Sequence, residues 1–413
     1  MTQTDKDVII IGGGPAGLAA AVKLHELGVR DILILEREHA LGGILRQCIH
    51  DGFGLTRFSQ TLTGPEYAQR FIDAAAEQGI AYMLDTTVLR MSAAHAVTAA
   101  SRKGLHRFNA RAIILAMGCR ERTRGALSIP GARPTGIYTA GVAQSYINLQ
   151  NTMVGKNAVI LGSGDIGMIM ARRLTLEGAR VSAVFELQPY PSGLPRNVEQ
   201  CLYDYDIPLY LRHTVTNILG DARLQAVEVS EVGEDLRPLP GTQRLYPCDT
   251  LILSVGLIPE NELALDAGVL LDAHTGGAVV DESYQTTVPG IFAAGNVLHV
   301  HDLVDFVSLE AERMAEAVKR YLAGEQAKPA IAVSAGRDVA YALPQHISGA
   351  RDALLTFRPR RPLRDATLRV LQDGQAILTK RFPRMLPAQM EQALLPAAAL
   401  KSHNPVEVVI GDA

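Results

Sequence analysis

The chain has 413 residues, of which 47% are hydrophobic and 20% are charged, and its formal net charge is −3. This length is sufficient for two or three domains with their own cores, and the composition is that of an ordinary globular α/β protein. With 5% aromatic residues and no tryptophan, the chain has neither the basic surface nor the stacking side chains of a nucleic-acid-binding protein. The sequence contains no uninterrupted run of about 18 apolar residues, so no integral membrane segment is predicted.

Two features predict a cytoplasmic protein. The cysteines at 48, 119, 201 and 248 form neither a C-x-x-C pair nor a plausible disulfide framework, which is typical of a reducing compartment. The first apolar run begins after about seven polar residues, which leaves no room for a signal peptide.

The first predicted elements are a strand, a glycine turn, a helix and a second strand within residues 7–36. The apolar run 8–11 precedes the sequence Gly-Gly-Gly-Pro-Ala-Gly, and Glu36 ends the apolar run 32–35. In dinucleotide-binding units the glycines allow a tight turn, close approach of a pyrophosphate and packing of helix on strand. The helix N-terminus offers free N–H groups to phosphates, and the acid accepts hydrogen bonds from ribose. The predicted contacts of this first cradle are Gly12, Gly14, Pro15, Ala16, Gly17, Glu36 and Arg37.

Further along the chain, a helix is predicted over residues 64–78, and β-branched stretches lead to the apolar run 112–118. Residues 120–136 are rich in Arg, Pro and Gly, so we expect an inter-domain connection over 119–154. The basic string 120–124 either steers an anionic substrate or partner, or is part of a solvated linker.

The strand–turn–helix–strand pattern then starts again. The apolar run 158–161 is followed by Gly-Ser-Gly-Asp-Ile-Gly, and Glu186 lies 24 positions after Gly162, the same spacing as Glu36 after Gly12. Two cradles predict two dinucleotides bound at once, with electron transfer between them. A carboxylate at position 186 repels a 2′-phosphate, and no arginine follows it, so NADH is favoured over NADPH. The predicted contacts of the second cradle are Gly162, Gly164, Asp165, Ile166, Gly167 and Glu186.

After the second cradle the chain contains two more apolar runs, at 249–256 and 290–295, and a predicted helix over 303–322. Residues 330–413 carry short alternating runs separated by turns and prolines, which predicts a small β domain.

The order of these motifs resembles that of the two-dinucleotide-binding-domain flavoproteins, the pyridine nucleotide–disulfide oxidoreductase superfamily. The segments 116–118, 254–261 and 290–296 resemble, in order, the two crossings between the domains and the second FAD motif. The resemblance covers roughly residues 5–325 and implies FAD in the first cradle and NAD in the second. It adds Gly43, Gly118, Gly295 and Asn296 to the FAD contacts. Asn296 stands where the family carries the acid that binds the flavin ribityl chain.

The fold that this resemblance implies is α/β, with two Rossmann-like domains, the NAD domain being inserted in the FAD domain, plus a small C-terminal β domain. The expected boundaries are 1–118 and 254–325 for the FAD domain, 119–154 for the connection, 155–253 for the NAD domain and 330–413 for the β domain.

The candidates for catalysis are fewer, because the paired cysteines of the disulfide reductases are missing. Cys48 is either a redox thiol activated by a basic neighbour or a packed small hydrophobe, and His50 is the second candidate. His299 and His301 either supply a proton donor beside the flavin or satisfy loop backbone groups. Their H-x-H spacing has no Cys or further His nearby, so no metal site is predicted.

A narrower resemblance concerns partners. Residues 136–144 are similar to a segment in FAD/NAD subunits of multi-component amine and opine dehydrogenases and cyanide synthase. Residues 42–54, 117–124 and 297–304 resemble the bacterial FAD oxidoreductases that accompany a glycerol-3-phosphate-dehydrogenase-like flavoprotein. The chain is therefore expected to exchange electrons between NAD and a partner flavoprotein. Two alternatives remain, direct oxidation of an amino acid, opine or amine, and a non-catalytic scaffold. The C-terminal domain is either a docking surface or a homo-oligomer interface.

Overall fold

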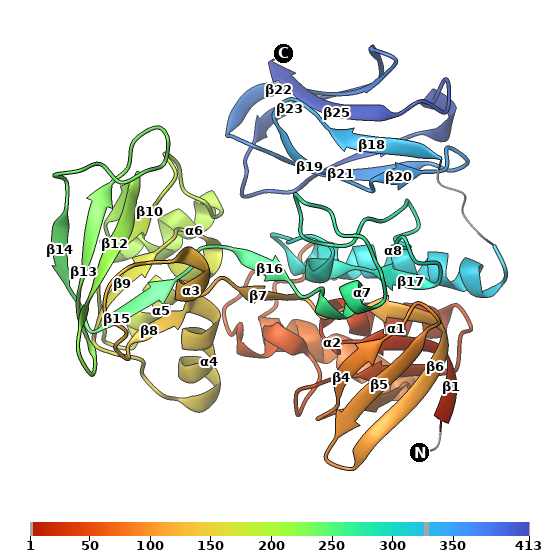
Figure 1. Ribbon diagram of the computed structural model, residues 1–413, viewed down its shortest axis with the longest axis horizontal. Helices are drawn as coiled ribbons and strands as arrows, with labels where there is room; N and C mark the ends of the chain where they lie inside the picture. The colour runs from red at the N-terminus through yellow and green to blue at the C-terminus, as the bar shows by residue number, and fades with distance from the viewer. Residues whose placement is uncertain (1–2, 326–329, 413) are drawn as a thin grey trace. The chain divides into compact units, whose positions relative to one another are not determined.

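The computed structural model describes residues 3–325 and 330–412. The chain forms two compact units, Met1–Cys119 together with Pro259–Ala413, and Arg120–Ile258. The second unit lies in sequence between the two parts of the first and is therefore an insertion in it. In Figure 1 the second unit is coloured yellow to green, between the red-to-orange and the green-to-blue stretches of the first. Among the described residues, no helix has both the length and the apolar character that crossing a membrane requires.

The first unit contains a seven-stranded sheet in which β1 lies between β2 and β6 and is parallel to both. Val8, Ile9 and Ile10 on β1 are fully buried, and such a continuous apolar run is typical of a central strand covered on both faces. The strands follow the order β3 (Ala81–Met83), β2 (Ile32–Leu35), β1 (Gln3–Ile11), β6 (Gly104–Leu115), β5 (Ala96–Ser101) and β4 (Thr87–Met91), and β17 (Ile291–Ala293) pairs with β6.

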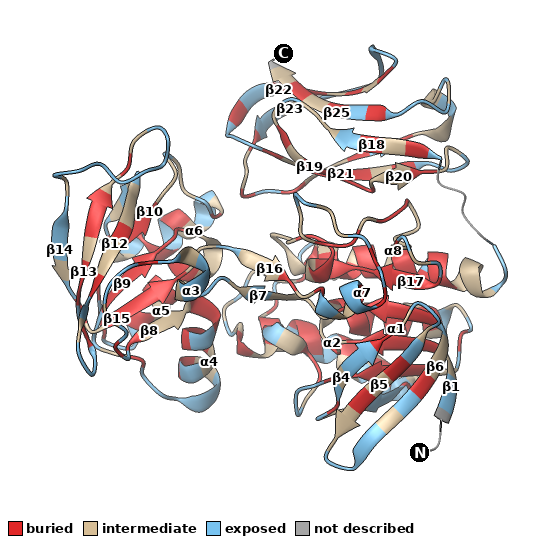
Figure 2. Cartoon of the chain, in the orientation of Figure 1, coloured by how far each residue is buried: buried red, intermediate tan, exposed pale blue. Residues whose placement is uncertain are grey.

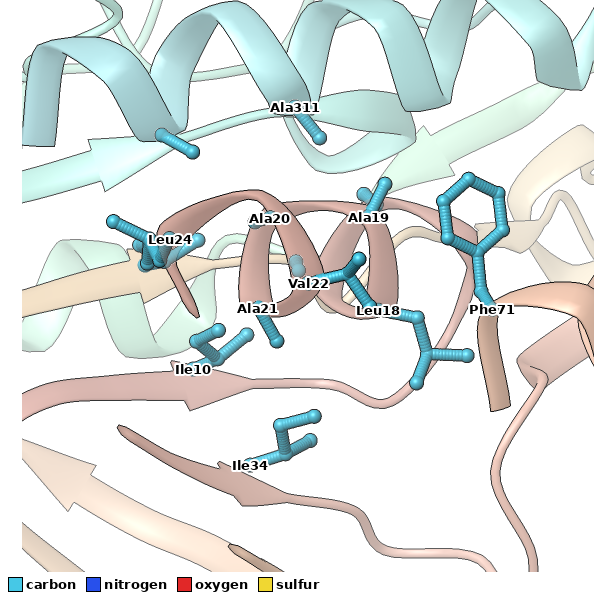
Figure 3. Packing of buried hydrophobic residues seen from close by; sticks show 14 of the residues in the cluster. Ile10, Leu18, Ala19, Ala20, Ala21, Val22, Leu24, Ile34, Phe71 and Ala311 are labelled. Carbon is cyan, nitrogen blue, oxygen red and sulfur yellow. The ribbon is translucent and has the colours of Figure 1, made fainter. Parts of the chain in front are cut away.

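The helices of this unit are α1 (Pro15–Glu26), α2 (Gly64–Glu77), α7 (Glu262–Asp266) and α8 (Val304–Leu322). Figure 3 shows α1 between the strand that carries Ile10 and helix α8, which carries Ala311. The small side chains of Ala19 and Ala20 let α1 and α8 approach closely. Figure 2 shows α8 as a mixture of buried and intermediate residues, with the buried ones forming the face that packs in the core. This packing fixes the N-terminus of α1 at the end of β1, where the first glycine cradle lies.

The second unit repeats this plan with a five-stranded parallel sheet and adds a three-stranded antiparallel sheet. The parallel sheet has the order β11 (Leu209–Leu211), β10 (Arg180–Glu186), β9 (Asn157–Leu161), β15 (Thr250–Leu253) and β8 (Ile137–Thr139). The antiparallel sheet has the order β12 (His213–Gly220), β13 (Leu224–Glu231) and β14 (Arg244–Pro247). The helices are α3 (Arg124–Leu127), α4 (Ala140–Gln150), α5 (Asp165–Leu176) and α6 (Pro195–Cys201).

The segment 119–154, expected as a simple connection, is largely part of this second unit. Strand β8 pairs with β15 in the parallel sheet, where Ile137 lies opposite Leu251, and α4 packs its Ala140, Ala143 and Ile147 into the core of the unit. The sequence did not indicate this because β8 becomes a strand only by pairing with β15, which lies far away in sequence.

Residues 331–412, called the C-terminal β domain below, fold into two further sheets and belong to the first unit. Its two sheets have the orders β20 (His346–Ile347), β18 (Ile331–Ala335), β25 (Val406–Asp412), β22 (Leu363–Gln372), β23 (Gln375–Met385), and β19 (Val339–Leu343), β21 (Ala353–Pro359), β24 (Glu391–Leu395). Side chains from both sheets, among them Leu355, Phe357 and Leu368, form one buried cluster. The boundaries 330–413 of a separate domain stay a prediction. Residues 326–329 and 413 lie outside the described residues.

The remaining elements are short. A two-stranded sheet is formed by β7 (Cys119–Glu121) and β16 (Leu257–Pro259). Single 3-10 turns occur at η1 (Gly43–Gln47), η2 (Tyr203–Tyr205), η3 (Gly295–Val297) and η4 (Ala397–Ala399).

Two candidate dinucleotide-binding sites

The three glycines of the first cradle differ in what surrounds them. A Cβ on Gly17 would lie 1.9 Å from the carbonyl oxygen of Gly12, and a Cβ on Gly12 would lie 2.4 Å from that of Ala116. Both glycines are therefore required by the packing of the protein itself. A Cβ on Gly14 would meet no closer atom than Gly43 Cα, at 3.8 Å. The open side of Gly14 is thus where a ligand can approach the backbone.

The N-terminus of α1 at this cradle has the character of an anion site. Gly14 is its N-cap and makes no side-chain capping bond, and Pro15 occupies the first turn. The Leu18 N–H group donates to the Gly14 carbonyl, so the amides of Ala16 and Gly17 precede the regular ladder of helical bonds. These amides and the helix dipole fit the pyrophosphate of a dinucleotide.

Glu36 is buried at the end of β2 and is held by the backbone. Its Oε2 accepts a hydrogen bond from Gly13 N–H at 2.6 Å, and its Oε1 accepts one from Glu38 N–H at 2.8 Å. A carboxylate has about four acceptor positions, so these bonds leave room for two more from a ribose diol. Arg37 is exposed and lies 3.9 Å from the Glu38 carboxylate, and its predicted contact with the cofactor stays a prediction.

Residues 290–296, which resemble the second FAD motif and are called the second flavin segment below, lie against the first cradle in the structure. A Cβ on Gly295 would lie 2.9 Å from Ala16 Cβ, so this glycine permits the close approach. The Asn296 amide oxygen accepts a bond from His301 N–H at 2.9 Å. Gly43 lies beside Gly14, with a left-handed φ of 55°, and a Cβ there would lie 3.0 Å from Gly14 Cα.

Gly118, at the expected crossing out of the first unit, also has a left-handed backbone, with φ of 71°. A Cβ at this position would meet nothing within 4 Å, so its backbone conformation rather than packing favours glycine.

The second cradle is built in the same way but is tighter. A Cβ on Gly162 would lie 2.0 Å from the Ser254 carbonyl oxygen, and one on Gly164 would lie 3.1 Å from Ser254 Oγ. Ser254 Oγ also accepts a bond from Gly167 N–H at 3.1 Å. The chain after β15 therefore packs directly on this turn, and the second cradle has less open space at its middle glycine than the first.

The side chain of Asp165 at the start of α5 binds the protein. Its Oδ1 accepts bonds from Leu194 N–H at 2.8 Å and from Asn197 Nδ2 at 2.6 Å, so it anchors the beginning of α6. The predicted cofactor contacts of Asp165 and Ile166 are not tested by these bonds. Those contacts stay predictions.

Glu186 is also buried, but its hydrogen bonds differ from those of Glu36. Its Oε2 accepts bonds from the Ser163 amide at 3.0 Å, the Ser163 hydroxyl at 2.6 Å and the Ser192 hydroxyl at 2.6 Å. Its Oε1 accepts one from Gln188 N–H at 2.9 Å. Room remains for one ribose hydroxyl on Oε1 rather than two. Ser192 was not predicted from the sequence, where its only signal is that it lies in the loop after β10.

For Cys48 the structure favours packing over redox chemistry. The residue follows η1, and its Sγ donates to the Ile44 carbonyl at 3.4 Å. Burial raises the pKa of the thiol to about 12, so it stays protonated at neutral pH, whereas a redox thiol reacts as the thiolate. His50 donates through Nδ1 to the Asp51 carbonyl at 3.0 Å, and its ring lies 5.0 Å from that of Phe53. Catalytic roles for Cys48 and His50 stay predictions.

His299 and His301 come together with a carboxylate that was not predicted as a site residue. His299 Nε2 lies 2.8 Å from Glu310 Oε2, and His301 Nε2 lies 3.4 Å from the same atom. Burial lowers the pKa of His299 to about 4, so its imidazole is neutral at pH 7. The position of Glu310, within helix α8, gave no sign of this contact in the sequence.

In the basic string the arginine at 124 has a structural role. Its guanidinium donates to the carbonyls of Ala132 at 2.6 Å and Gly131 at 3.0 Å, which closes the loop after α3. This gives Arg124 a structural role within the second unit, and steering of a substrate or partner by the basic string stays a prediction.

Comparison with known proteins agrees with this architecture. Residues 6–324 match the family model described as pyridine nucleotide-disulphide oxidoreductase. The chain is 27% identical to the thioredoxin reductase of Listeria innocua, over 70% of this chain and 85% of that protein. It is 26% identical to the glutamate synthase [NADPH] small chain of Mycobacterium tuberculosis, over 79% of this chain and 69% of that protein. It is 27% identical to an opine oxidase subunit of Agrobacterium tumefaciens, over 70% of this chain and 61% of that protein.

The fold is shared with a solved structure. The T. acidophilum thioredoxin reductase superposes with a TM-score of 0.64 at 24% identity and covers 77% of this chain and 98% of its own. This confirms the predicted α/β class with Rossmann-like dinucleotide-binding folds. Members of the matched family bind FAD and NAD(P)H. Since the family model spans more than half of the residues, the chain belongs to the pyridine nucleotide-disulphide oxidoreductase family.

Proposed function

We propose that this chain is an FAD-dependent oxidoreductase that exchanges hydride with NADH and serves as the electron-transfer component of a multi-component dehydrogenase. The observation that carries the proposal is a pair of glycine cradles, each with a buried glutamate, in a chain without a redox dithiol. Among the described residues no disulfide joins the four cysteines. The lack of a thiol pair leaves direct exchange between the two dinucleotides as the simplest route.

The roles of the chain's own residues follow from the geometry of the first unit. The amides of Ala16 and Gly17 bind the pyrophosphate, Gly14 admits it, and Glu36 accepts hydrogen bonds from the adenosine ribose. Gly295 and Asn296 hold the ribityl region. FAD held there would supply a hydride acceptor for NADH and an electron donor for a second acceptor. The protein contributes alignment and exclusion of water, and productive transfer requires reacting atoms about 3–3.5 Å apart.

In the second unit, Glu186 selects the nicotinamide cofactor. Its carboxylate is buried and offers one further acceptor site, which we assign to a ribose hydroxyl. A 2′-phosphate there would meet a negative charge in a poorly solvated site, which favours NADH.

The names of several relatives support a role within a larger assembly. The glutamate synthase small chain, the opine oxidase subunit and the hydrogen cyanide synthase subunit HcnB are all named as parts of larger enzymes. We propose a glycerol-3-phosphate-dehydrogenase-like flavoprotein as the partner in the cytoplasm, in keeping with the motif resemblance and the lack of C-x-x-C spacing.

One alternative has an observation of its own. The likeness to the opine oxidase subunit favours direct oxidation of an opine or amine. The two functions are separated by anaerobic additions to the FAD-loaded protein, one of NADH and one of a secondary-amine opine. Loss of flavin absorbance with NADH alone supports the proposal. Loss with the opine alone contradicts it and supports the alternative.

A further inference from the structure

A buried chain of hydrogen bonds connects the C-terminal β domain to the backbone of the second flavin segment. The Tyr341 hydroxyl on β19 lies 3.1 Å from His299 Nδ1. The His299 Nε2–H group donates to Glu310 Oε2 at 2.8 Å, and Glu310 Oε1 accepts a bond from Gly295 N–H at 2.8 Å. The chain of bonds thus runs from a domain beyond the family match, which ends at residue 324, to the glycine that packs against α1.

The side chains that form this series of hydrogen bonds are shielded from water. Tyr341 is 9% exposed, Glu310 3% and His299 1%. Hydrogen bonds in such surroundings are strong, and a buried polar group that loses its partner is costly. A replacement at one end is therefore expected to disturb the groups at the other end.

The protonation states determine which group donates and which accepts in each hydrogen bond of this series. The neutral His299 donates through Nε2 to the carboxylate, so its Nδ1 must accept, and the Tyr341 hydroxyl must donate. Burial alone would raise the pKa of Glu310, but the two neighbouring imidazoles outweigh it and hold that pKa below its usual range. Glu310 is therefore ionised, and an ionised acceptor makes the stronger bond to Gly295 N–H.

The same carboxylate also reaches the neighbouring residue of the flavin segment. His301 Nε2 lies 3.4 Å from Glu310 Oε2, and the His301 amide donates to Asn296 Oδ1 at 2.9 Å. Glu310 consequently fixes the backbone at Gly295 directly. Its approach to His301 Nε2 is a close contact without the geometry of a hydrogen bond, so the Asn296 side chain is held by the His301 amide and not through Glu310.

The C-terminal domain holds the rest of this loop as well. The Arg358 guanidinium donates to the Val300 carbonyl at 3.0 Å and lies 3.6 Å from the Asp302 carboxylate. Asp302 in turn accepts a bond from Met390 N–H at 3.1 Å. The segment between Asn296 and α8 is therefore bound to the domain at several points.

We propose that Glu310, His299 and Tyr341 are positioning residues through which the C-terminal β domain sets how tightly the flavin is held and at what potential it is reduced. This inference rests on the proposed function for the first cradle. It gives the C-terminal domain a task that does not depend on a partner protein.

Two imidazoles and a carboxylate are also ligand types for zinc, and the three ligand atoms lie within 4.8 Å of one another. However, the 2.8 Å between His299 and Glu310 is a hydrogen-bond distance, shorter than the spacing of about 3.3 Å between ligands that lie 2.0 Å from a tetrahedral zinc ion. The positive charge of Arg358, 3.4 Å from the Tyr341 hydroxyl, further disfavours a cation. The geometry thus favours direct hydrogen bonding, and metal content is one outcome of the test.

The test compares three variants of the full-length protein, Glu310→Gln, Tyr341→Phe and the control Tyr67→Phe. The control removes a fully buried hydroxyl that donates to Ser308 Oγ on the same helix α8 at 2.8 Å, so it loses an equivalent bond without touching the chain to Gly295. The readouts are the FAD dissociation constant of the apoprotein, the midpoint potential of the bound flavin and the melting temperature.

We expect Glu310→Gln to raise the FAD dissociation constant about tenfold or more, because it weakens charge-assisted bonds. Tyr341→Phe should raise it about threefold and shift the midpoint potential in the same direction as Glu310→Gln. Tyr67→Phe should lower the melting temperature while leaving both flavin readouts unchanged.

Tyr341→Phe behaving like Tyr67→Phe would overturn the inference, and so would one equivalent of bound zinc that leaves upon chelation together with the FAD. A wild-type protein that binds FAD but is not reduced by NADH contradicts the proposed function alone. A wild-type protein that binds no FAD contradicts both.

Discussion

Glu36 and Glu186 occupy the same position in two copies of one motif, and the structure surrounds them differently. Glu36 accepts two backbone bonds, whereas Glu186 accepts four, three of them on one oxygen. The spacing after each glycine turn predicts that an acid lies at the end of the second strand, because parallel strands of a Rossmann unit place it there. Its remaining hydrogen-bonding capacity depends on loop residues such as Ser192, which no spacing identifies.

The position of Glu186 leads to a prediction on cofactor choice. Replacing it with arginine removes the negative charge and supplies a donor for a 2′-phosphate, so the NADPH/NADH ratio of kcat/KM should rise at least about tenfold. Glu186→Gln, which keeps the size but not the charge, should give a smaller rise. The measurement is steady-state reduction of an artificial acceptor with each nicotinamide. An unchanged ratio in both variants would count against the role of Glu186.

A second residue-scale prediction concerns stability against pH. Burial raises the pKa of Glu391 on β24 to about 7, with Lys380 offsetting part of this effect. The folded state then binds more protons than the unfolded chain between an unfolded pKa of about 4.3 and 7, so this group's contribution to stability is lost as the pH rises through that window. Glu391→Gln should therefore raise the melting temperature relative to wild type more at pH 8 than at pH 5.

The matched control for that experiment is Glu77→Gln, at an exposed position at the end of α2. Its difference from wild type should be the same at both pH values. A Glu391→Gln difference that is equally flat would show that the carboxyl is ionised throughout.

At the scale of elements, the sequence was most informative where the signal was local. The helices expected at 64–78 and 303–322 are Gly64–Glu77 and Val304–Leu322, and the first has a capping box of Thr63 and Glu66. Strand β8 was missed because three residues carry no periodicity and its status depends on pairing with β15, more than a hundred positions later. The hydrogen-bonded cluster around Glu310 was missed for the same reason, since its members come from a loop, from helix α8 and from strand β19, which are distant in sequence.

The glycine cradle gives an element-scale prediction that separates folding from binding. Gly17→Ala should strongly destabilise the first unit, because its Cβ would overlap the Gly12 carbonyl oxygen, and overpacking of a core typically costs about 1–3 kcal/mol and occasionally more. Gly14→Ala has room for its methyl group in the protein, so the apoprotein should melt close to wild type. Its FAD dissociation constant should still rise about tenfold or more, since the methyl group occupies the approach of the pyrophosphate.

Melting curves of the apoproteins and FAD titrations of both variants measure these effects. If Gly14→Ala binds FAD like wild type, the pyrophosphate does not approach this glycine.

At the scale of the whole molecule, the two units have the architecture of enzymes that pass electrons to a thiol pair, but this chain has no such pair. The spacing of its four cysteines predicts this from the sequence. The β fold of the C-terminal domain followed from its alternating runs. The contacts of this domain with the second flavin segment could not be predicted, because they join residues such as Tyr341 and His299 that are distant in sequence.

Anaerobic titration of the FAD-loaded protein with NADH tests the central claim most directly. Because no dithiol is available to store a second electron pair, we predict that about one equivalent of NADH removes the oxidised flavin absorbance, and that Cys48→Ser has the same end point. Failure of NADH to change the absorbance, or an end point of two equivalents that falls to one in Cys48→Ser, would contradict it.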